Sequence, residues 1–287
     1  MKPVCIIEGN CNGEALTQML KMVPEFSATF EVVFSPSFRG PDPRRSVCTE
    51  DQIRRCALLL NQVTHWEPEL DLPRAMSPTT RIIRYPILFN NTLWPLNRQD
   101  PRPFRGLGLR GERFPYGDSL LLQLMKQGEA QAVILERYLA TDLMTLVDLD
   151  RFHEINVIKG KELDLESDIT INSYIAENFS HVRLFSTFNH PRPNLLLRLA
   201  AAVLHETGMG HLTADVVRQI AENPPLNRVE IPIHPQVARH FGVTWFEENA
   251  RYRFFEFGDI TFREYLEICL NPGCLVDKNQ HSPASIS

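Results

Sequence analysis

The first hydrophobic pattern of the chain lies at its N-terminus. An apolar run over residues 4–7 ends at Gly9 and Asn10, and apolar positions resume with helical spacing over residues 15–20. This pattern predicts a strand, a tight turn and a helix. Residues 30–34 then alternate and are rich in β-branched and aromatic side chains, which predicts a second strand. The opening is therefore a βαβ unit, which predicts a parallel sheet with a right-handed crossover.

Later patterns add strands and many helices. A continuous apolar run at 56–60 predicts a buried third strand ending at Asn61 and Gln62, and residues 80–85 predict a fourth strand that Pro86 stops. Short extended segments are expected at 181–186 and 229–233. Helices are expected after Thr49 and Asp118 as N-caps, over residues 130–149, 195–204, 234–241 and 261–270, and at the end of 163–179.

Taken together, these elements predict an α/β protein with a parallel-sheet core and a large helical share. The 287 residues suffice for one large domain or two modest ones, and neither an internal repeat nor a clean linker divides them. We expect a single catalytic domain over residues 1–276 and a mobile polar tail over 277–287.

Composition narrows the class of protein. A formal charge of −5 argues against a nucleic-acid-binding protein that works through a globally basic surface. The chain opens without a signal-peptide pattern, and no apolar run approaches the ~18 residues that span a bilayer. Six cysteines without a CxxC pair indicate free thiols in a reducing compartment. We expect a cytoplasmic protein without a transmembrane segment, and peripheral association with a membrane machinery stays open.

Cys11 lies on the turn between the first strand and the first helix. There its sulfur would face the first free N–H groups of the helix, a field that favours an anion and lowers the pKa of a thiol. The position also resembles the strand-to-helix elbow that presents nucleophiles in hydrolases. The alternative interpretation is that Cys11 only packs beneath the turn.

A reactive cysteine needs a base, and histidine serves best near neutral pH. We expect His190 on a second strand-to-helix turn, where a parallel sheet would bring it to the same edge as Cys11. His234, also followed by proline, is the rival candidate. Donors for an oxyanion are expected from the Cys11 N–H and from side chains near strand ends: Asn10, Asn12, Asn61 and Gln62.

Residues 90–117 form a long stretch rich in proline, glycine and arginine. Guanidinium groups bind phosphate bidentately, so this stretch suits a phosphorylated ligand, although a solvated basic loop has the same composition. The candidate phosphate ligands are Arg98, Arg102, Arg105, Arg110 and Arg113. The chain lacks the GxxxxGK[ST], GxGxxG and HExxH motifs, so a P-loop nucleotidase, a dinucleotide fold and a metal-dependent activity have no support.

Several short motifs follow one another along residues 4–210. They are the GNCNGEAL segment at 9–16, Asn61-Gln62, the RYPILF segment at 84–89, the YGD segment at 116–118 and FNHP at 188–191. In kind and in order these motifs resemble the WcbI family of polysaccharide biosynthesis proteins. The pattern is also similar, more distantly, to SGNH-type hydrolases and acetyltransferases. In those proteins an acid stands three positions before the histidine, where this chain has Thr187.

The resemblance implies a single SGNH-like α/β domain, binding of coenzyme A with Tyr116 near the cofactor, and acetyl transfer from acetyl-CoA to a saccharide acceptor in capsular or other surface-polysaccharide synthesis. It also implies Cys11 and His190 as the catalytic pair. Two routes stay open: an acylated Cys11, or direct attack of a sugar hydroxyl deprotonated by His190. The other hypotheses are an SGNH-like thiol esterase or deacylase and a non-catalytic polysaccharide-assembly protein.

Overall fold

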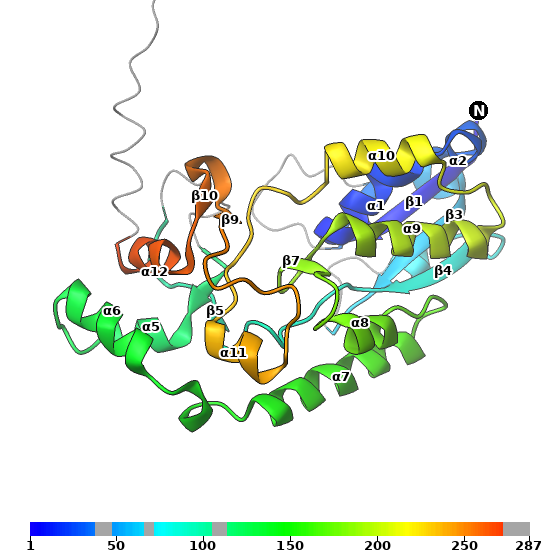
Figure 1. Cartoon of the computed structure of the whole chain (residues 1–287). Coiled ribbons are helices and arrows are strands. Elements are labelled where there is room, and N and C mark those ends of the chain that lie inside the picture. The colour runs from blue at the N-terminus through cyan, green and yellow to red at the C-terminus, as the bar shows by residue number, and fades with distance from the viewer. Residues whose placement is uncertain (38–47, 66–71, 105–113, 272–287) are drawn as a thin grey trace, which may run out of the picture. The chain divides into compact units, whose positions relative to one another are not determined.

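The computed structural model describes residues 1–37, 48–65, 72–104 and 114–271 (Figure 1). These residues group into two compact units. The first comprises Met1–Asn90 and Glu154–Asn227, and the second comprises Asn91–His153 and Arg228–Ser287. One catalytic domain over residues 1–276 stays a prediction, and the tail expected at 277–287 lies outside the described residues.

The first unit is built on a four-stranded parallel sheet in the order β2-β1-β3-β4 (Figure 1). All six residues of β1 are buried, as expected for an inner strand of a parallel sheet. The four predicted strands are therefore confirmed, and the fold is α/β. The strands are β1 (Val4–Gly9), β2 (Glu31–Pro36), β3 (Cys56–Val63) and β4 (Arg81–Pro86).

Helices pack on this sheet. The apolar side of α1 (Cys11–Lys21) contacts β1, β2 and α9 (Pro193–Thr207). A separate hydrophobic cluster forms where Val4 and Ile6 of β1 meet Leu72. The other helices of this unit are α2 (Pro24–Thr29), α3 (Glu50–Arg54), α4 (Leu72–Ala75), α8 (Asn172–Asn178) and α10 (Ala214–Glu222), while α7 (Leu149–Leu165) contributes residues to both units.

Aromatic side chains form the core of the second unit. Phe104 and Phe114 stack with ring centroids 4.6 Å apart, and Phe254 meets Phe114 edge-on at 5.8 Å. The helices around this core are α5 (Ser119–Met125), α6 (Gln131–Ala140), α11 (Pro235–His240) and α12 (Phe262–Leu270). Two short antiparallel ladders join β5 (Asn97–Arg98) to β6 (Gly117–Asp118) and β9 (Tyr252–Arg253) to β10 (Asp259–Ile260).

Local capping matches the sequence. The side chains of Thr49, Asp118 and Thr261 accept hydrogen bonds from the first turns of α3, α5 and α12. The helix expected over 130–149 is wrong in its extent: α6 ends at Ala140, and Asp142 caps a separate 3₁₀ turn (Leu143–Thr145). Aspartate competes for backbone N–H groups in this way and so ends helices. The sequence patterns did not predict α7 or α10.

Within the described residues, none of the helices combines the length and the apolar character that crossing a bilayer requires.

Candidate functional site

Cys11 is the first residue of α1, one position beyond the turn where we expected it. Asn10 is the N-cap, and its side-chain oxygen accepts a hydrogen bond from the Asn12 N–H at 2.9 Å. The Cys11 N–H is among the first N–H groups of the helix, which have no acceptor within it. The thiol is half-buried. A partly accessible sulfur at a helix N-terminus is the predicted environment of a reactive cysteine.

Asn12 connects three segments of the first unit. Its Nδ2 donates to the carbonyl oxygen of Asn189 at 3.1 Å and lies 3.8 Å from Cys11 Sγ, and its Oδ1 accepts from the Leu88 N–H at 3.0 Å. Its side chain is fully buried. Since Asn189 precedes His190, these contacts bring the Cys11 turn and the His190 turn together, as the sequence predicted.

The structural element that carries His190 differs from the predicted one. His190 does not follow a strand of the main sheet: β7 (Phe185–Thr187) and β8 (His190–Pro191) pair with each other in a separate antiparallel hairpin. Thr187 shapes this hairpin, because its Oγ1 accepts from the His190 N–H at 3.1 Å and donates to Asn189 Oδ1 at 2.9 Å. The hydroxyl that replaces the expected acid thus organises the backbone beside the histidine.

His190 is a neutral imidazole at physiological pH. Burial lowers its pKa to about 4 from an ordinary value of 6.5, because the charged form is poorly solvated. A neutral ring retains a lone pair that can accept a proton.

Gln62 and Asn61 are neighbours near the end of β3, but their side chains have different partners. Gln62 Oε1 accepts from the Asn10 N–H at 2.9 Å, whereas its buried Nε2 has no hydrogen-bond partner among the described residues. Asn61 Nδ2 instead donates to the carboxylate of Glu8 at 2.5 Å. Successive side chains of a strand point to opposite faces, so only Gln62 shares the face of Asn10. The structure therefore brings Gln62, Asn10, Asn12 and Cys11 together and directs Asn61 elsewhere.

Two buried residues near the turn were not singled out from the sequence. Glu8 is 1% exposed on β1, and the fully buried Tyr85 donates its hydroxyl hydrogen to the Glu8 carbonyl oxygen at 2.8 Å. The sequence could have indicated Glu8, because it is a carboxylate at the end of an otherwise apolar strand. Tyr85 belongs to the RYPILF segment, but that motif assigned it no role in the site, because its hydrogen-bond partner lies 77 positions away.

The arginine stretch belongs to the second unit. Arg98 is exposed on β5. Arg102 forms an ion pair with Asp100 at 2.6 Å and donates to the carbonyl oxygens of Leu270 and Cys269, which gives it a structural role. The backbone oxygen of the buried Tyr116 accepts the Tyr265 hydroxyl. The remaining candidates, Arg105, Arg110 and Arg113, lie outside the described residues.

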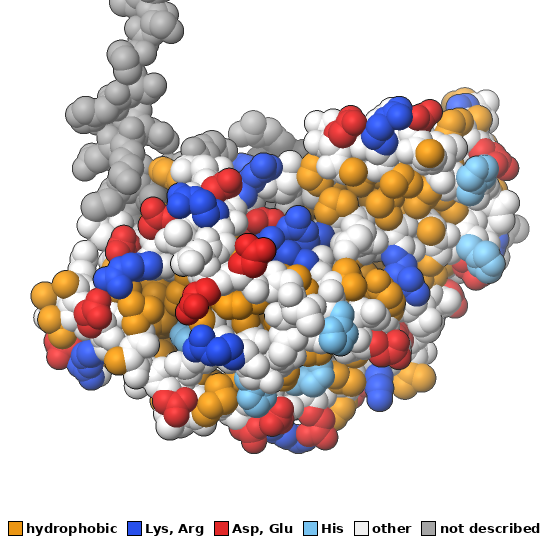
Figure 2. All heavy atoms as spheres, in the orientation of Figure 1, with side chains coloured by type: hydrophobic (Ala, Val, Ile, Leu, Met, Phe, Trp, Pro, Cys, Tyr) orange, Lys and Arg blue, Asp and Glu red, His pale blue; other side chains and the backbone are white. Residues whose placement is uncertain are grey.

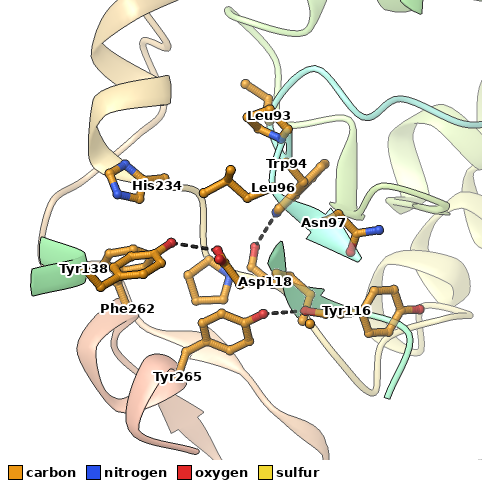
Figure 3. A pocket seen from close by; sticks show the side chains of 14 residues that line it. Leu93, Trp94, Leu96, Asn97, Tyr116, Asp118, Tyr138, His234, Phe262 and Tyr265 are labelled. Atoms are coloured by element: carbon orange, nitrogen blue, oxygen red, sulfur yellow. Dashed lines mark hydrogen bonds between the residues drawn. The ribbon is translucent and has the colours of Figure 1, made fainter. Parts of the chain in front are cut away.

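An aromatic-lined cavity of about 30 Å³ lies in the second unit (Figure 3). Space of this size holds about two water molecules. Asp118 lies in its wall and accepts the Tyr138 hydroxyl at 2.7 Å, and burial raises the pKa of Asp118 to about 6. The rival histidine, His234, lies in the same wall as the N-cap of α11, and burial lowers its pKa to about 4. Its contacts assign His234 a structural role.

A groove in the first unit lies between α1 and α10, lined in part by Met19, Met22 and Ile220. Hydrophobic side chains also gather over the α9 and α10 surface (Figure 2). Neither this groove nor the aromatic cavity is lined by Cys11 or His190. Among the described residues, no group of three or more His, Cys, Asp and Glu side chains is arranged to hold a metal ion.

A family profile decides the classification. The profile of WcbI, described as a polysaccharide biosynthesis enzyme, matches residues 4–212. The chain belongs to the WcbI family. WcbI is described as a polysaccharide biosynthesis enzyme, as the motif resemblance predicted. The matched residues include both the Cys11 turn and the His190 turn.

A solved WcbI structure has the same fold. It covers 95% of this chain and 90% of its own, with a TM-score of 0.69 and 20% sequence identity. It is described as the native form of WcbI, a polysaccharide biosynthesis enzyme, without a disulfide bond between coenzyme A and a cysteine. The search of curated proteins found no match.

Proposed function

We propose that this WcbI-family protein transfers an acyl group, in the first instance acetyl, from coenzyme A to a sugar hydroxyl in the synthesis of a capsular or other surface polysaccharide. The observation that carries the proposal is the pair of contacts from Asn12 Nδ2 to Asn189 O and Cys11 Sγ. It joins a helix-terminal thiol to the hairpin that bears a neutral imidazole. A nucleophile beside a base is the arrangement that acyl transfer requires.

Coenzyme A is the proposed acyl carrier. The description of the solved WcbI structure refers to a disulfide bond between coenzyme A and a cysteine of that protein. A cysteine able to form that bond lies beside the sulfur that carries the acyl group, and we assign this position to Cys11. Residues that hold the coenzyme A phosphates are not identified among the described residues, where Arg98 stays a candidate.

Gln62 supports the same site. Its Nε2 is a buried donor without a partner among the described residues, while its Oε1 is held by the Asn10 N–H. A buried donor left without an acceptor destabilises the fold by about 1–3 kcal/mol, so a ligand oxygen is the fitting partner. The Cys11 N–H and Gln62 Nε2 would together donate two hydrogen bonds to the oxygen of the acyl carbonyl as that oxygen becomes negative.

His190 accepts a proton in either of two routes. In the first, Cys11 attacks the acyl carbon as the thiolate and displaces the coenzyme A thiolate. His190 then takes the proton of the sugar hydroxyl as the sugar oxygen attacks the acyl-cysteine, Cys11 leaves as the thiolate, and the proton passes to the coenzyme A thiolate. In the second, His190 takes the same proton while the sugar oxygen attacks the thioester directly, and the proton passes to the leaving thiolate. Cys11 then acts through its N–H.

The test begins with coenzyme A alone. Saturating ligand should raise the melting temperature of the protein, because a ligand that binds only the folded state stabilises it. Brief mixing with acetyl-CoA and mass spectrometry then separates the routes: an acetyl group on the Cys11 peptide, lost in Cys11→Ser, supports the first. Absence of any melting shift at millimolar coenzyme A contradicts the transferase and favours an esterase that needs no carrier.

A further inference from the structure

Tyr85 lies directly beneath the turn that carries Cys11. Its side chain is fully buried, and its hydroxyl donates to the Glu8 carbonyl oxygen at 2.8 Å. In the register of the sheet, Tyr85 of β4 stands beside Gln62 of β3, which holds the Asn10 N–H. Two neighbouring strands thus send polar groups to the same turn.

Two glycines make room for the hydroxyl. A Cβ added at Gly9 would lie 2.6 Å from Tyr85 Oη, and one added at Gly13 would lie 2.7 Å from it. Real Cβ atoms essentially never approach other heavy atoms this closely. Gly9 and Gly13 flank Cys11 in sequence, so the hydroxyl fills the hollow of the backbone segment that bears the thiol.

The hydroxyl stays protonated in this position. Burial raises the pKa of Tyr85 well above its ordinary value, and the nearby Glu8, Cys11 and Cys5 raise it further. The group therefore remains a donor to Glu8 across the physiological range.

We propose that Tyr85 is a positioning residue for Cys11: its hydroxyl fills the space between Gly9 and Gly13 and fixes the backbone on which the thiol is carried. The inference rests on the proposed role of Cys11 as the reactive cysteine. A small displacement of a reacting atom lowers rates by up to about 100-fold, so an anchor beneath the turn controls reactivity without touching substrate.

The test is a double-mutant cycle of Tyr85→Phe and Gly13→Ala, read by urea unfolding. In the native background the alanine methyl meets the hydroxyl. In the Tyr85→Phe background the nearest remaining neighbour of that methyl is Phe34 Cε2 at 3.4 Å, an ordinary contact. Gly13→Ala should therefore lower the folding equilibrium constant about 10-fold more in the native background than in the Tyr85→Phe background. Additive effects overturn the proposal.

The second readout is the alkylation rate of Cys11 by iodoacetamide, followed by peptide mapping, which needs no coenzyme A. Tyr85→Phe should slow it about 2- to 5-fold, because a displaced sulfur loses the field of the helix N-terminus. The matched control is Tyr138→Phe, which removes a hydroxyl of equal burial that bonds Asp118 in the second unit. Equal alkylation rates in the native protein and both variants overturn the proposal.

If the Tyr85→Phe variant fails to fold, the Gly13→Ala variant alone tests the positioning role of Tyr85. Its methyl group must displace the hydroxyl, so slower alkylation in the folded variant supports positioning, and an unchanged rate contradicts it. Both measurements report on the thiol and the fold only. If coenzyme A fails to bind, the proposed function is refuted, whereas the positioning role of Tyr85 is still decided by the unfolding and alkylation measurements.

Discussion

Asn12 donates its side-chain amide to the carbonyl oxygen of Asn189, 3.1 Å away and 177 positions along the chain. The same amide lies 3.8 Å from Cys11 Sγ. One buried side chain thus links the N-terminus of α1 to the hairpin that carries His190. This link joins two turns that share no strand of the main sheet.

Replacing Asn12 tests the link. Asn12→Ala removes the side-chain hydrogen bonds to the Leu88 N–H and the Asn189 carbonyl oxygen, so we expect the free energy of unfolding to fall by about 2 kcal/mol or more. Release of free coenzyme A from acetyl-CoA should fall as well, because the two turns separate. Urea unfolding and a thiol-release assay measure the two effects.

The matched control for that variant is Asn172→Ala. Asn172 is also buried in the first unit and donates its Nδ2 to Asp164 at 2.9 Å. This variant should lose about 1–3 kcal/mol of stability and retain its activity while folded. Equal loss of activity in both folded variants would show that Asn12 acts only through global stability.

Gln62→Glu removes one donor and keeps one acceptor. The Oε1 that holds the Asn10 N–H is retained, while Nε2 becomes an oxygen that repels a developing oxyanion. Turnover of acetyl-CoA should fall about 100- to 1,000-fold, the usual effect of losing an oxyanion donor. Gln52→Glu, the same change within the capping box of α3, should leave turnover unchanged. Undiminished turnover in folded Gln62→Glu would remove Gln62 from the site.

The pH profile of turnover reports on His190. Burial lowers the pKa of His190 to about 4, so the imidazole stays neutral and able to accept a proton until the pH falls to that value. We expect the acid limb of kcat/KM near pH 4 rather than near the ordinary histidine value of about 6.5. A limb at pH 6 to 7 that disappears in His190→Gln would contradict the neutral, desolvated ring.

Asp118 makes the second unit less stable as the pH rises. Burial raises its pKa from 3.8 to about 6, so the folded state holds the proton more tightly than the unfolded state. The stability this contributes is present below about pH 4 and is lost as the pH rises through about 6, by up to about 3 kcal/mol.

Asp118→Asn isolates that effect. Asparagine keeps an oxygen for the Leu121 N–H at the N-cap and cannot ionise. As the pH rises from 4 to 6, the unfolding free energy of Asp118→Asn should increase relative to that of the native protein. The depressed pKa values of His190 and His234 act in the opposite sense and cancel in this difference. A difference that is independent of pH would show that the carboxyl is not desolvated.

Local signals in the sequence predicted much of the fold. The apolar runs located all four strands of the main sheet, and Thr49 and Asp118 were identified as caps because short polar side chains compete for free N–H groups in the first helical turn. The long helix α7 was missed, since its apolar residues do not form one clear stripe.

The candidate site was predictable only in part. The strand-turn-helix pattern located Cys11, and the motif resemblance pointed to His190. The place of the His190 hairpin beside Cys11, the bridging role of Asn12 and the place of Tyr85 depend on contacts between segments 76 or more positions apart, which local patterns do not report. The alternation along β3 then separated Gln62 from Asn61, once the partner strands were known.

The most direct test of the account is a kinetic double-mutant cycle of Cys11→Ala and His190→Ala. It is read as release of free coenzyme A from acetyl-CoA, with water or a panel of monosaccharides as acceptor. If Cys11 is acylated and the two residues act as one site, each single variant should lose about 100- to 10,000-fold in rate, and the double variant should lose no more than the worse single variant. Losses that multiply, or single variants that turn over acetyl-CoA at the native rate, would contradict an acyl-cysteine site shared by Cys11 and His190.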